Sequence, residues 1–142
     1  MKGYPARFEK NDDGRFSVFF LGSGMEGCIT YGNDESDAER NAQEALDAYI
    51  GYLYSSKKDI PFPADISGDD IHYFLPDCRI RFAIVLRWER EKDSLTQWDM
   101  AMRLGILPAQ YQRLENPRKT NPTLDTMHRI EMALGREVFL RI

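Results

Sequence analysis

The apolar residues of this chain repeat with two different periods, and this change constrains the fold more than any other feature. In the first part, Tyr4, Ala6 and Phe8 alternate with polar neighbours, a period of two that predicts half-buried strands. From Ile80 onward the period is 3.6, which predicts helices. With 142 residues, 42% of them hydrophobic, the chain has room for one domain or two small ones. We therefore predict an α+β protein in two parts.

The first part is predicted to be a three- or four-stranded antiparallel sheet with one covering helix. Asp13-Gly14 favours a tight turn between the first two strands. A helix is expected over residues 37–54, with Ser36 as its N-cap and Glu39 completing a capping box. Its apolar stripe has to lie on the sheet. The expected strands are residues 4–9, 16–20, 28–31 and 71–75.

The second part is predicted to be a small helical domain that ends in a short strand. Pro76 cannot sit inside a following strand or helix, so the boundary is placed at 76–78, giving domains 1–75 and 76–142. Thr96 with Asp99 indicates a helix start, and Gly105 a helix end. The expected helices are 80–92, 96–104, 108–115 and one that begins at Thr123 or Asp125, followed by a strand at 137–142.

The charge changes sign at the same boundary. Residues 1–76 carry 7 Lys/Arg against 14 Asp/Glu, whereas residues 77–142 carry 12 against 9. This asymmetry favours two partners of opposite charge, although surface charge can also vary by chance. The longest apolar run, Phe82–Leu86, is too short for a membrane span, and the first residues contain no secretory signal. We expect a cytoplasmic protein that does not bind membranes.

The strongest motif is a helix-turn-helix between Thr96 and Glu115. Ala101 is small where two helices cross, Gly105 permits the turn, and Tyr111 faces the core. The outward side chains of the second helix include Gln and Arg, which read adenine and guanine edges in the major groove. An ordinary helical packing unit with a solvated Gln/Arg face is the alternative. The predicted DNA-binding residues are Gln97, Pro108, Ala109, Gln110, Gln112, Arg113, Arg118 and Lys119.

Other motifs favour no catalysis, no metal and no cofactor. Gly22–Gly27 matches GxGxxG, but a strand-like run follows it where a dinucleotide site needs a helix, so a loop with a positive φ at Gly27 is expected. Cys28 has no visible basic partner and is expected to be a small core residue. The two histidines, His72 and His128, do not form a metal-binding motif. A metal-dependent nuclease is disfavoured, because its carboxylates need rigid elements and most of the candidates fall in turns. These candidates are Glu9, Asp12, Asp13, Glu26, Asp34, Glu35 and Asp37.

The chain contains, in this order, Tyr4-Pro5-Ala6, Gly27-Cys28, Ile60-Pro61, Gln112-Arg113-Leu114 and Leu124-Asp125-Thr126. Over about 90% of the chain this order resembles the HicB antitoxin family, and the last two motifs resemble HicB proteins with an Xre-type C-terminal domain. The resemblance implies a partial RNase-H-like first domain without catalysis, a small HicA mRNA-interferase toxin as partner, and repression of the operon that encodes both. The loop Leu21–Glu26 is longer and richer in glycine than the usual turn of the family.

We therefore expect an antitoxin that acts by binding alone and is not an enzyme. The acidic first domain is expected to attract a basic RNA-cleaving toxin near Glu26, Asp34 and Glu35. The basic second domain is expected to bind operator DNA, with the last strand, 137–142, joining copies into a homodimer or homotetramer. A transcription regulator with a small-molecule-sensing first domain is the alternative, and a metal-dependent nuclease ranks below it.

Overall fold

The computed structural model describes residues 1–140. The chain divides into two compact units, Met1–Asp77 and Cys78–Ile142. Strands and one helix make up the first unit, and helices the second, so the α+β class is confirmed. In chain order the elements are β1 (Tyr4–Lys10), β2 (Phe16–Phe20), β3 (Ile29–Gly32), α1 (Glu35–Ser55), β4 (Ile71–Phe74), α2 (Cys78–Lys92), α3 (Gln97–Leu104), α4 (Pro108–Leu114) and α5 (Leu124–Leu134).

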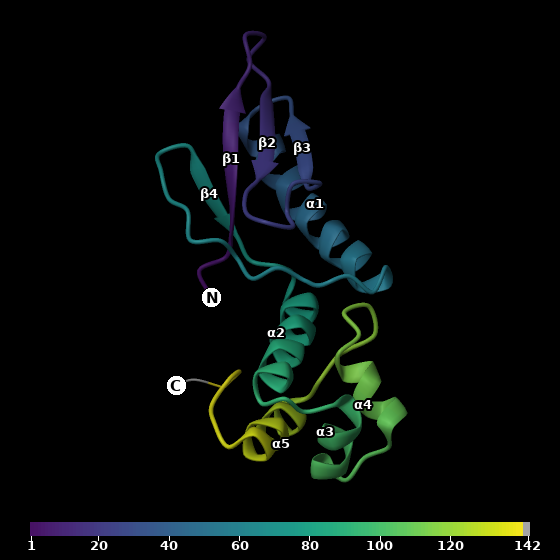
Figure 1. The fold of residues 1–142 in the computed structure, drawn as a ribbon. Coiled ribbons are helices and arrows are strands. Elements are labelled where there is room, and N and C mark those ends of the chain that lie inside the picture. The colour runs from purple at the N-terminus through teal and green to yellow at the C-terminus, as the bar shows by residue number, and fades with distance from the viewer. Residues whose placement is uncertain (141–142) are drawn as a thin grey trace. The chain divides into compact units, whose positions relative to one another are not determined.

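The first unit is an antiparallel sheet in the order β3-β2-β1-β4, with α1 packed on one face (Figure 1). Alternation along β1 sends Tyr4, Ala6 and Phe8 toward the core, as predicted. Leu46 and Ile50 of α1 are fully buried in the same core. Strands β3 and β4 are therefore the two edges of the sheet.

Helix α1 begins two residues earlier than predicted. The N-cap is Asp34, whose carboxylate accepts the N–H of Asp37 at 2.8 Å, whereas Ser36 lies inside the first turn. Asp37 in turn accepts the N–H of Asn33 at 2.9 Å. Both acceptors of this reciprocal pair are carboxylates, whereas the predicted pair of Ser36 and Glu39 offers one hydroxyl and one carboxylate. Hydrogen bonds to charged acceptors are stronger, which favours the earlier start.

The helix start lies against β3 at Gly32. A Cβ atom at Gly32 would collide with the backbone of Ala38, so only glycine fits at this crossing. In the glycine-rich loop before β3, Gly22 and Gly24 adopt positive φ, and the prediction of a positive φ at Gly27 is wrong. Gly27 instead faces the ring of Tyr49, and a Cβ there would meet that ring at 3.2 Å.

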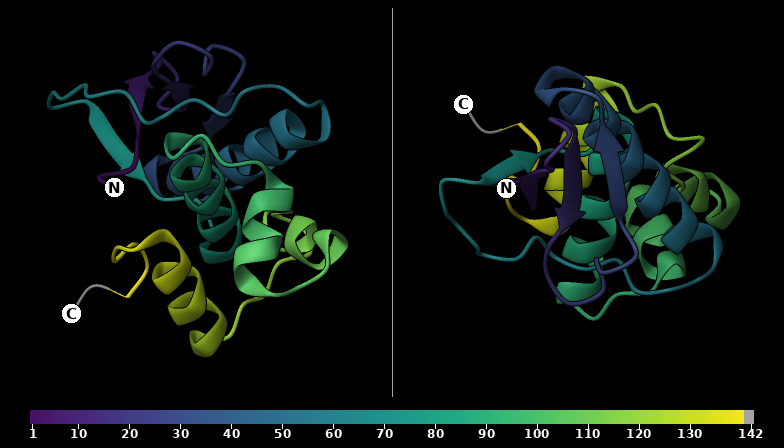
Figure 2. Two further views of the ribbon diagram at one scale, coloured as in Figure 1. Left: turned by 60° about the horizontal axis from the view of Figure 1, so that its bottom comes forward. Right: turned by 90° about the horizontal axis from the view of Figure 1, so that it is seen from above.

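The helices of the second unit, α2 to α5, pack together (Figure 2). They enclose one apolar cluster. Thr96 and Asp99 form the predicted capping box of α3, and Gly105 ends this helix in the left-handed region. Thr123 is the N-cap of α5, which settles the two starts that the sequence left open. None of the helices in the described part of the chain is long and apolar enough to cross a bilayer.

The predicted terminal strand is absent from residues 137–140, and residues 141–142 lie outside the described part. The carboxylate of Glu131 explains this difference. Its Oε2 accepts the backbone N–H groups of Val138, Phe139 and Leu140 at 2.6, 2.8 and 3.0 Å. The ring of Phe139 packs on Phe82, with 4.8 Å between centroids. The backbone N–H groups of residues 138–140 are thus already hydrogen-bonded within the unit and do not pair with another strand.

Candidate nucleic-acid interface and partner surface

Helices α3 and α4 form a helix-turn-helix. After Gly105, with a φ of +66°, the N–H of Ile106 donates to the carbonyl of Ala101 at 3.0 Å and closes the turn. Ala101 and Tyr111 are fully buried where the two helices meet. The small side chain of Ala101 allows this close crossing, and Tyr111 fixes the inner side of α4.

The outer side of α4 is exposed to solvent. Tyr111 is buried and Leu114 is half-buried, so the orientation of α4 agrees with the sequence-based expectation. The exposed residues are Pro108, Ala109, Gln110, Gln112 and Arg113. Their contact with DNA stays a prediction.

Gln110 differs from its exposed neighbours because it has a structural partner. Its side-chain oxygen accepts the backbone N–H of Leu107 at 2.9 Å and so caps the start of α4. Gln112 and Arg113 lie on the same exposed side near the end of this short helix. Gln112 and Arg113 are thus better placed than Gln110 to reach a base edge.

A hollow of about 310 Å³ lies beside Arg113, between α4 and the first turn of α5. Lys119 lines it from the connecting loop, and Thr123 caps α5 at its edge. The buried hydroxyl of Thr120 also lines it and has no hydrogen-bond partner within residues 1–140. Two cationic side chains and a helix start suit a phosphate group. Arg118 is exposed on the same loop.

A buried ion pair, which sequence reasoning missed, joins the helices on the inner side. Arg90 of α2 binds Glu115, directly after α4, and its Nη1 also donates to the carbonyl of Leu95 at 2.7 Å. The amide of Gln97 donates to Glu115 at 3.2 Å. The predicted DNA-binding residue Gln97 is therefore half-buried and tied to a neighbouring side chain. Arg90 and Glu115 are 25 positions apart, so no local sequence pattern indicates that they pair.

The three residues predicted to bind the toxin do not form one cluster. Glu26 precedes β3, and its carboxylate accepts the N–H of Gly24 at 2.9 Å. Asp34 follows β3 and caps α1. Glu35 is exposed, with a carboxylate oxygen 4.0 Å from Nε2 of His72 in β4. Glu26 and Asp34 thus flank the edge strand β3, and Glu35 lies toward the other edge of the sheet.

His72 also contacts a second carboxylate, an arrangement that sequence reasoning missed. Its Nδ1 lies 2.6 Å from Oε1 of Glu39, and its ring stacks on Phe8 with 4.0 Å between centroids. Glu35 and Glu39 are four residues apart and share one side of α1, a spacing that is visible in the sequence. His72 comes from 33 residues further on. Both ring nitrogens thus lie near a carboxylate, which explains this group as a polar contact between α1 and β4.

Cys28 and the glycine-rich loop are structural elements of the first unit. Burial raises the pKa of the Cys28 thiol to about 12, so the sulfur stays protonated at neutral pH and is a poor nucleophile. The loop closes through Met25, which is 1% exposed and whose N–H donates to the carbonyl of Gly22 at 3.0 Å. A strand, β3, follows this loop, so the helix start that a dinucleotide site needs is missing at this point.

Two family models match the chain, one in each unit. The model described as HicB_like antitoxin of bacterial toxin-antitoxin system matches residues 3–78, and a helix-turn-helix model matches residues 86–139. A solved structure, the N-terminal domain of the Burkholderia pseudomallei antitoxin HicB, shares 22% sequence identity over 44% of this chain and 72% of that chain, with a TM-score of 0.39. No curated protein matches the chain.

An antitoxin-like unit followed by a helix-turn-helix defines a regulator of the DNA-binding antitoxin class. The chain belongs to the HicB-like antitoxin family, since that match covers more than half of its length. The predicted resemblance is thereby confirmed for both parts of the chain.

Proposed function

We propose that this chain is the antitoxin of a type II toxin–antitoxin pair. Its first unit neutralises a HicA-type mRNA interferase by direct binding, and its second unit represses the operon that encodes both proteins. Both activities require binding alone, without a catalytic step. The observation that carries this proposal is that a HicB-like unit precedes a helix-turn-helix whose second helix exposes Gln112 and Arg113.

The proposed DNA contacts divide into two kinds. Gln112 and Arg113 read base edges, with Arg113 as the candidate for a two-point contact to guanine. Pro108 and Ala109 are small and allow the start of α4 to enter the groove. Lys119 and Arg118 contact phosphates, together with the start of α5.

The proposed toxin contacts rest on charge. The first unit, residues 1–77, carries 7 Lys/Arg against 15 Asp/Glu. A toxin that cleaves RNA needs a basic surface, because it has to hold phosphates, and the acidic unit would compete for that surface. Glu26, Asp34 and Glu35 are exposed and remain the proposed contacts.

Binding to DNA is proposed to require two copies of the chain. One helix-turn-helix reads a short site, so specificity needs two half-sites about one helical turn apart. A homodimer or homotetramer meets this need. The strand at 137–142 no longer supports the contact between copies, because Glu131 holds the backbone of residues 138–140.

The full chain should be purified and titrated with two probes. The first is the DNA upstream of its own gene, and the second is a purified HicA-type protein whose gene adjoins it. We expect a complex with each probe, protection of RNA from cleavage by the second, and preference for the upstream DNA over scrambled DNA. Binding to neither probe would reject the proposal, and binding to DNA alone would favour a regulator without a toxin partner.

A further inference from the structure

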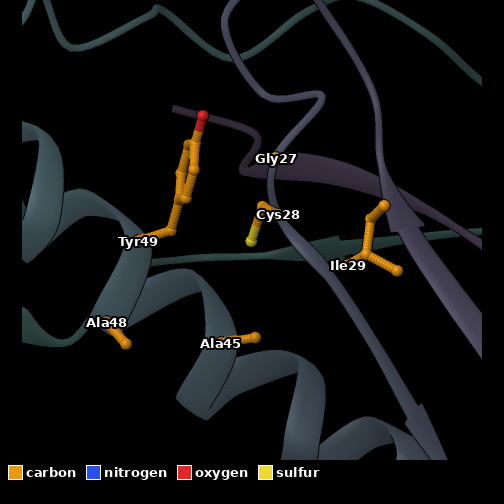
Figure 3. A pocket seen from close by; sticks show the side chains of 6 residues that line it. All are labelled: Gly27, Cys28, Ile29, Ala45, Ala48 and Tyr49. Atoms are coloured by element: carbon orange, nitrogen blue, oxygen red, sulfur yellow. The ribbon is translucent and has the colours of Figure 1, made fainter.

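The edge strand β3 borders a small apolar pocket that the proposed function does not explain. The pocket lies between β3 and α1 and has a volume of about 260 Å³ (Figure 3). The side chain of Cys28 points toward α1, and that of Ala45 points from α1 toward β3. The side chain of Ile29 points to the side of β3 that faces away from the pocket. Ala45 and Ala48 keep the helix side of the pocket shallow. The pocket is thus large enough for an aliphatic side chain.

At every second residue of β3, the backbone N–H and carbonyl groups point away from the sheet. The N–H of Phe20 donates to the carbonyl of Cys28 at 3.1 Å, so in an antiparallel ladder Cys28 and Thr30 bond to β2. The N–H and carbonyl groups of Ile29 and Tyr31 then point away from the sheet. Asn41 of α1 donates to the carbonyl of Tyr31 at 2.8 Å, which agrees with this direction.

The side chains of β3 are apolar and open to solvent on the face opposite α1. Ile29 is 55% exposed and Tyr31 is 73% exposed. An added strand needs unpaired backbone groups with which to form a ladder. Its side chains alternate between the two faces of the sheet, so it also needs an apolar contact on each face. Strand β3 offers apolar side chains on one face and the pocket on the other. A compact small molecule would use the pocket and leave the backbone groups unpaired.

The charges around β3 define the chemistry of the occupant. Glu26 precedes the strand and Asp34 follows it, and Glu44 is exposed on α1 one turn from Ala48. Arg40, a neighbouring cation, is bound by Asp37. A second copy of the acidic first unit would bring like charges together, whereas a basic partner would find opposite charges at both ends of the strand.

We infer that β3 is the docking strand for the toxin: an extended segment with cationic flanks pairs with Ile29 and Tyr31 and inserts one apolar side chain between Cys28 and Ala45. This inference rests on the proposed function and adds the surface and the mode of binding. Because Asn41 occupies the carbonyl of Tyr31, the added ladder uses the N–H and carbonyl of Ile29 and the N–H of Tyr31.

Amide hydrogen exchange of the full chain tests the pairing directly. The probe is the purified HicA-type protein encoded beside this chain's gene. Without it, the amides of Ile29 and Tyr31 should exchange at least tenfold faster than that of Thr30, which bonds to β2. With it, exchange at Ile29 and Tyr31 should slow by more than tenfold. A complex in which both amides keep their fast exchange overturns the inference.

Two substitutions test the edge and the pocket separately. Ile29→Pro removes an outward N–H without breaking a bond to β2, and Ala45→Gln fills the pocket without changing charge. Each should weaken toxin binding more than tenfold while DNA binding is retained. Ser36→Gln, on an exposed position of the same helix, is the control and should bind as the unsubstituted chain does. Should Ile29→Pro fail to fold, Ala45→Gln still decides, and normal toxin affinity of that variant contradicts the inference.

The failures can be told apart. If the unsubstituted chain does not bind the toxin, the proposed function fails. If that chain binds the toxin and both variants bind equally well, only the docking strand is wrong. If Ile29→Pro halves the mass in sedimentation and keeps toxin affinity, the occupant of β3 is a second copy, which also overturns the inference.

Discussion

The guanidinium group of Arg90 and the carboxylate of Glu115 bind at two points, with Nε 2.6 Å from Oε2 and Nη2 3.0 Å from Oε1. The Glu115 side chain is 1% exposed and that of Arg90 is 11% exposed. Since α2 carries one partner and the residue after α4 carries the other, this pair fixes the end of α4 relative to the helix before the helix-turn-helix.

Removal of Arg90 should therefore destabilise the second unit strongly. Arg90→Met leaves a buried, unpaired carboxylate, which costs about 3–5 kcal/mol. Arg87→Met is a matched control on the same helix, because its pair with Glu91, at 2.9 Å, is partly exposed and is worth about 0–1 kcal/mol. Urea denaturation of both variants measures the difference. Similar losses in the two variants would contradict a structural role for the Arg90–Glu115 pair.

Substitution of Arg113 should reduce the sequence preference of DNA binding. Loss of one base contact costs about 1–3 kcal/mol and relaxes one position of the operator. Arg113→Ala should therefore bind the operator more weakly and lose the base preference at that position, yet bind the toxin normally. Operator titration and toxin pull-down on the same purified variant measure both effects. Loss of toxin binding with intact DNA binding would reverse the assignment of the two units.

The loop cations should act without regard to sequence. Arg118→Ala and Lys119→Ala should weaken binding to operator and scrambled DNA alike. Each should lower the slope of log affinity against log salt concentration by about one if the side chain contacts a phosphate. Titrations at several salt concentrations give these slopes. An unchanged slope removes the residue from the proposed interface.

Neutral variants of the acidic residues should slow toxin association. Glu26→Gln, Asp34→Asn and Glu35→Gln remove three negative charges, and asparagine at position 34 still caps α1. The association rate should fall and become less sensitive to salt, because exposed charges steer the encounter. Stopped-flow measurements at low and high salt give both quantities. If the association rate does not depend on these three residues, other charged residues steer the encounter with the toxin.

Acid should release the residues held by Glu131. Hydrogen bonds from the backbone N–H groups of Leu140 and Val138, and from that of Phe139, lower the pKa of the Glu131 carboxyl below its usual range. Because the pKa of Glu131 is lower in the folded state than in the unfolded state, its carboxylate stabilises the fold. This stabilisation is fully present above the pKa of the unfolded state and is lost as the pH falls through the pKa of the folded state. Amide exchange at residues 138–140, referred to the intrinsic rate at each pH, should therefore accelerate below about pH 4.

The variant Glu131→Gln should show this acceleration at neutral pH. Glutamine retains an oxygen acceptor but lacks the charge, so the three hydrogen bonds weaken. Glu137→Gln, one residue before the bound segment, is the control. If the exchange of residues 138–140 in Glu131→Gln follows that of the unsubstituted chain at every pH, the carboxylate does not hold the segment.

Local rules made most of the fold predictable. The apolar periods of two and 3.6 residues located the strands and helices, and Thr96, Asp99 and Gly105 located the helix-turn-helix. Each of these signals involves residues within one turn or one strand. The start of α1 was missed because two acceptable N-caps, Asp34 and Ser36, lie two residues apart. The hydrogen bonds of Asp34 and Asp37 fix the earlier start.

Long-range contacts could not be read from the sequence. The pair of Arg90 and Glu115 and the contact of His72 with Glu39 join residues 25 and 33 positions apart. The terminal segment was predicted as a strand from its alternation alone. A buried carboxylate at Glu131 competed for the same backbone N–H groups and prevailed, because hydrogen bonds to a charged acceptor are stronger than ladder bonds.

The hydrogen bond from Asn41 to the carbonyl of Tyr31 limits how far the sheet of the first unit can grow. An uncapped edge strand invites repeated addition of strands, the route by which sheets join into insoluble fibres. With one carbonyl already occupied, β3 accepts a short segment and not a full-length neighbour. The same side chain that shapes the docking strand thereby protects the chain from aggregation when no partner is bound.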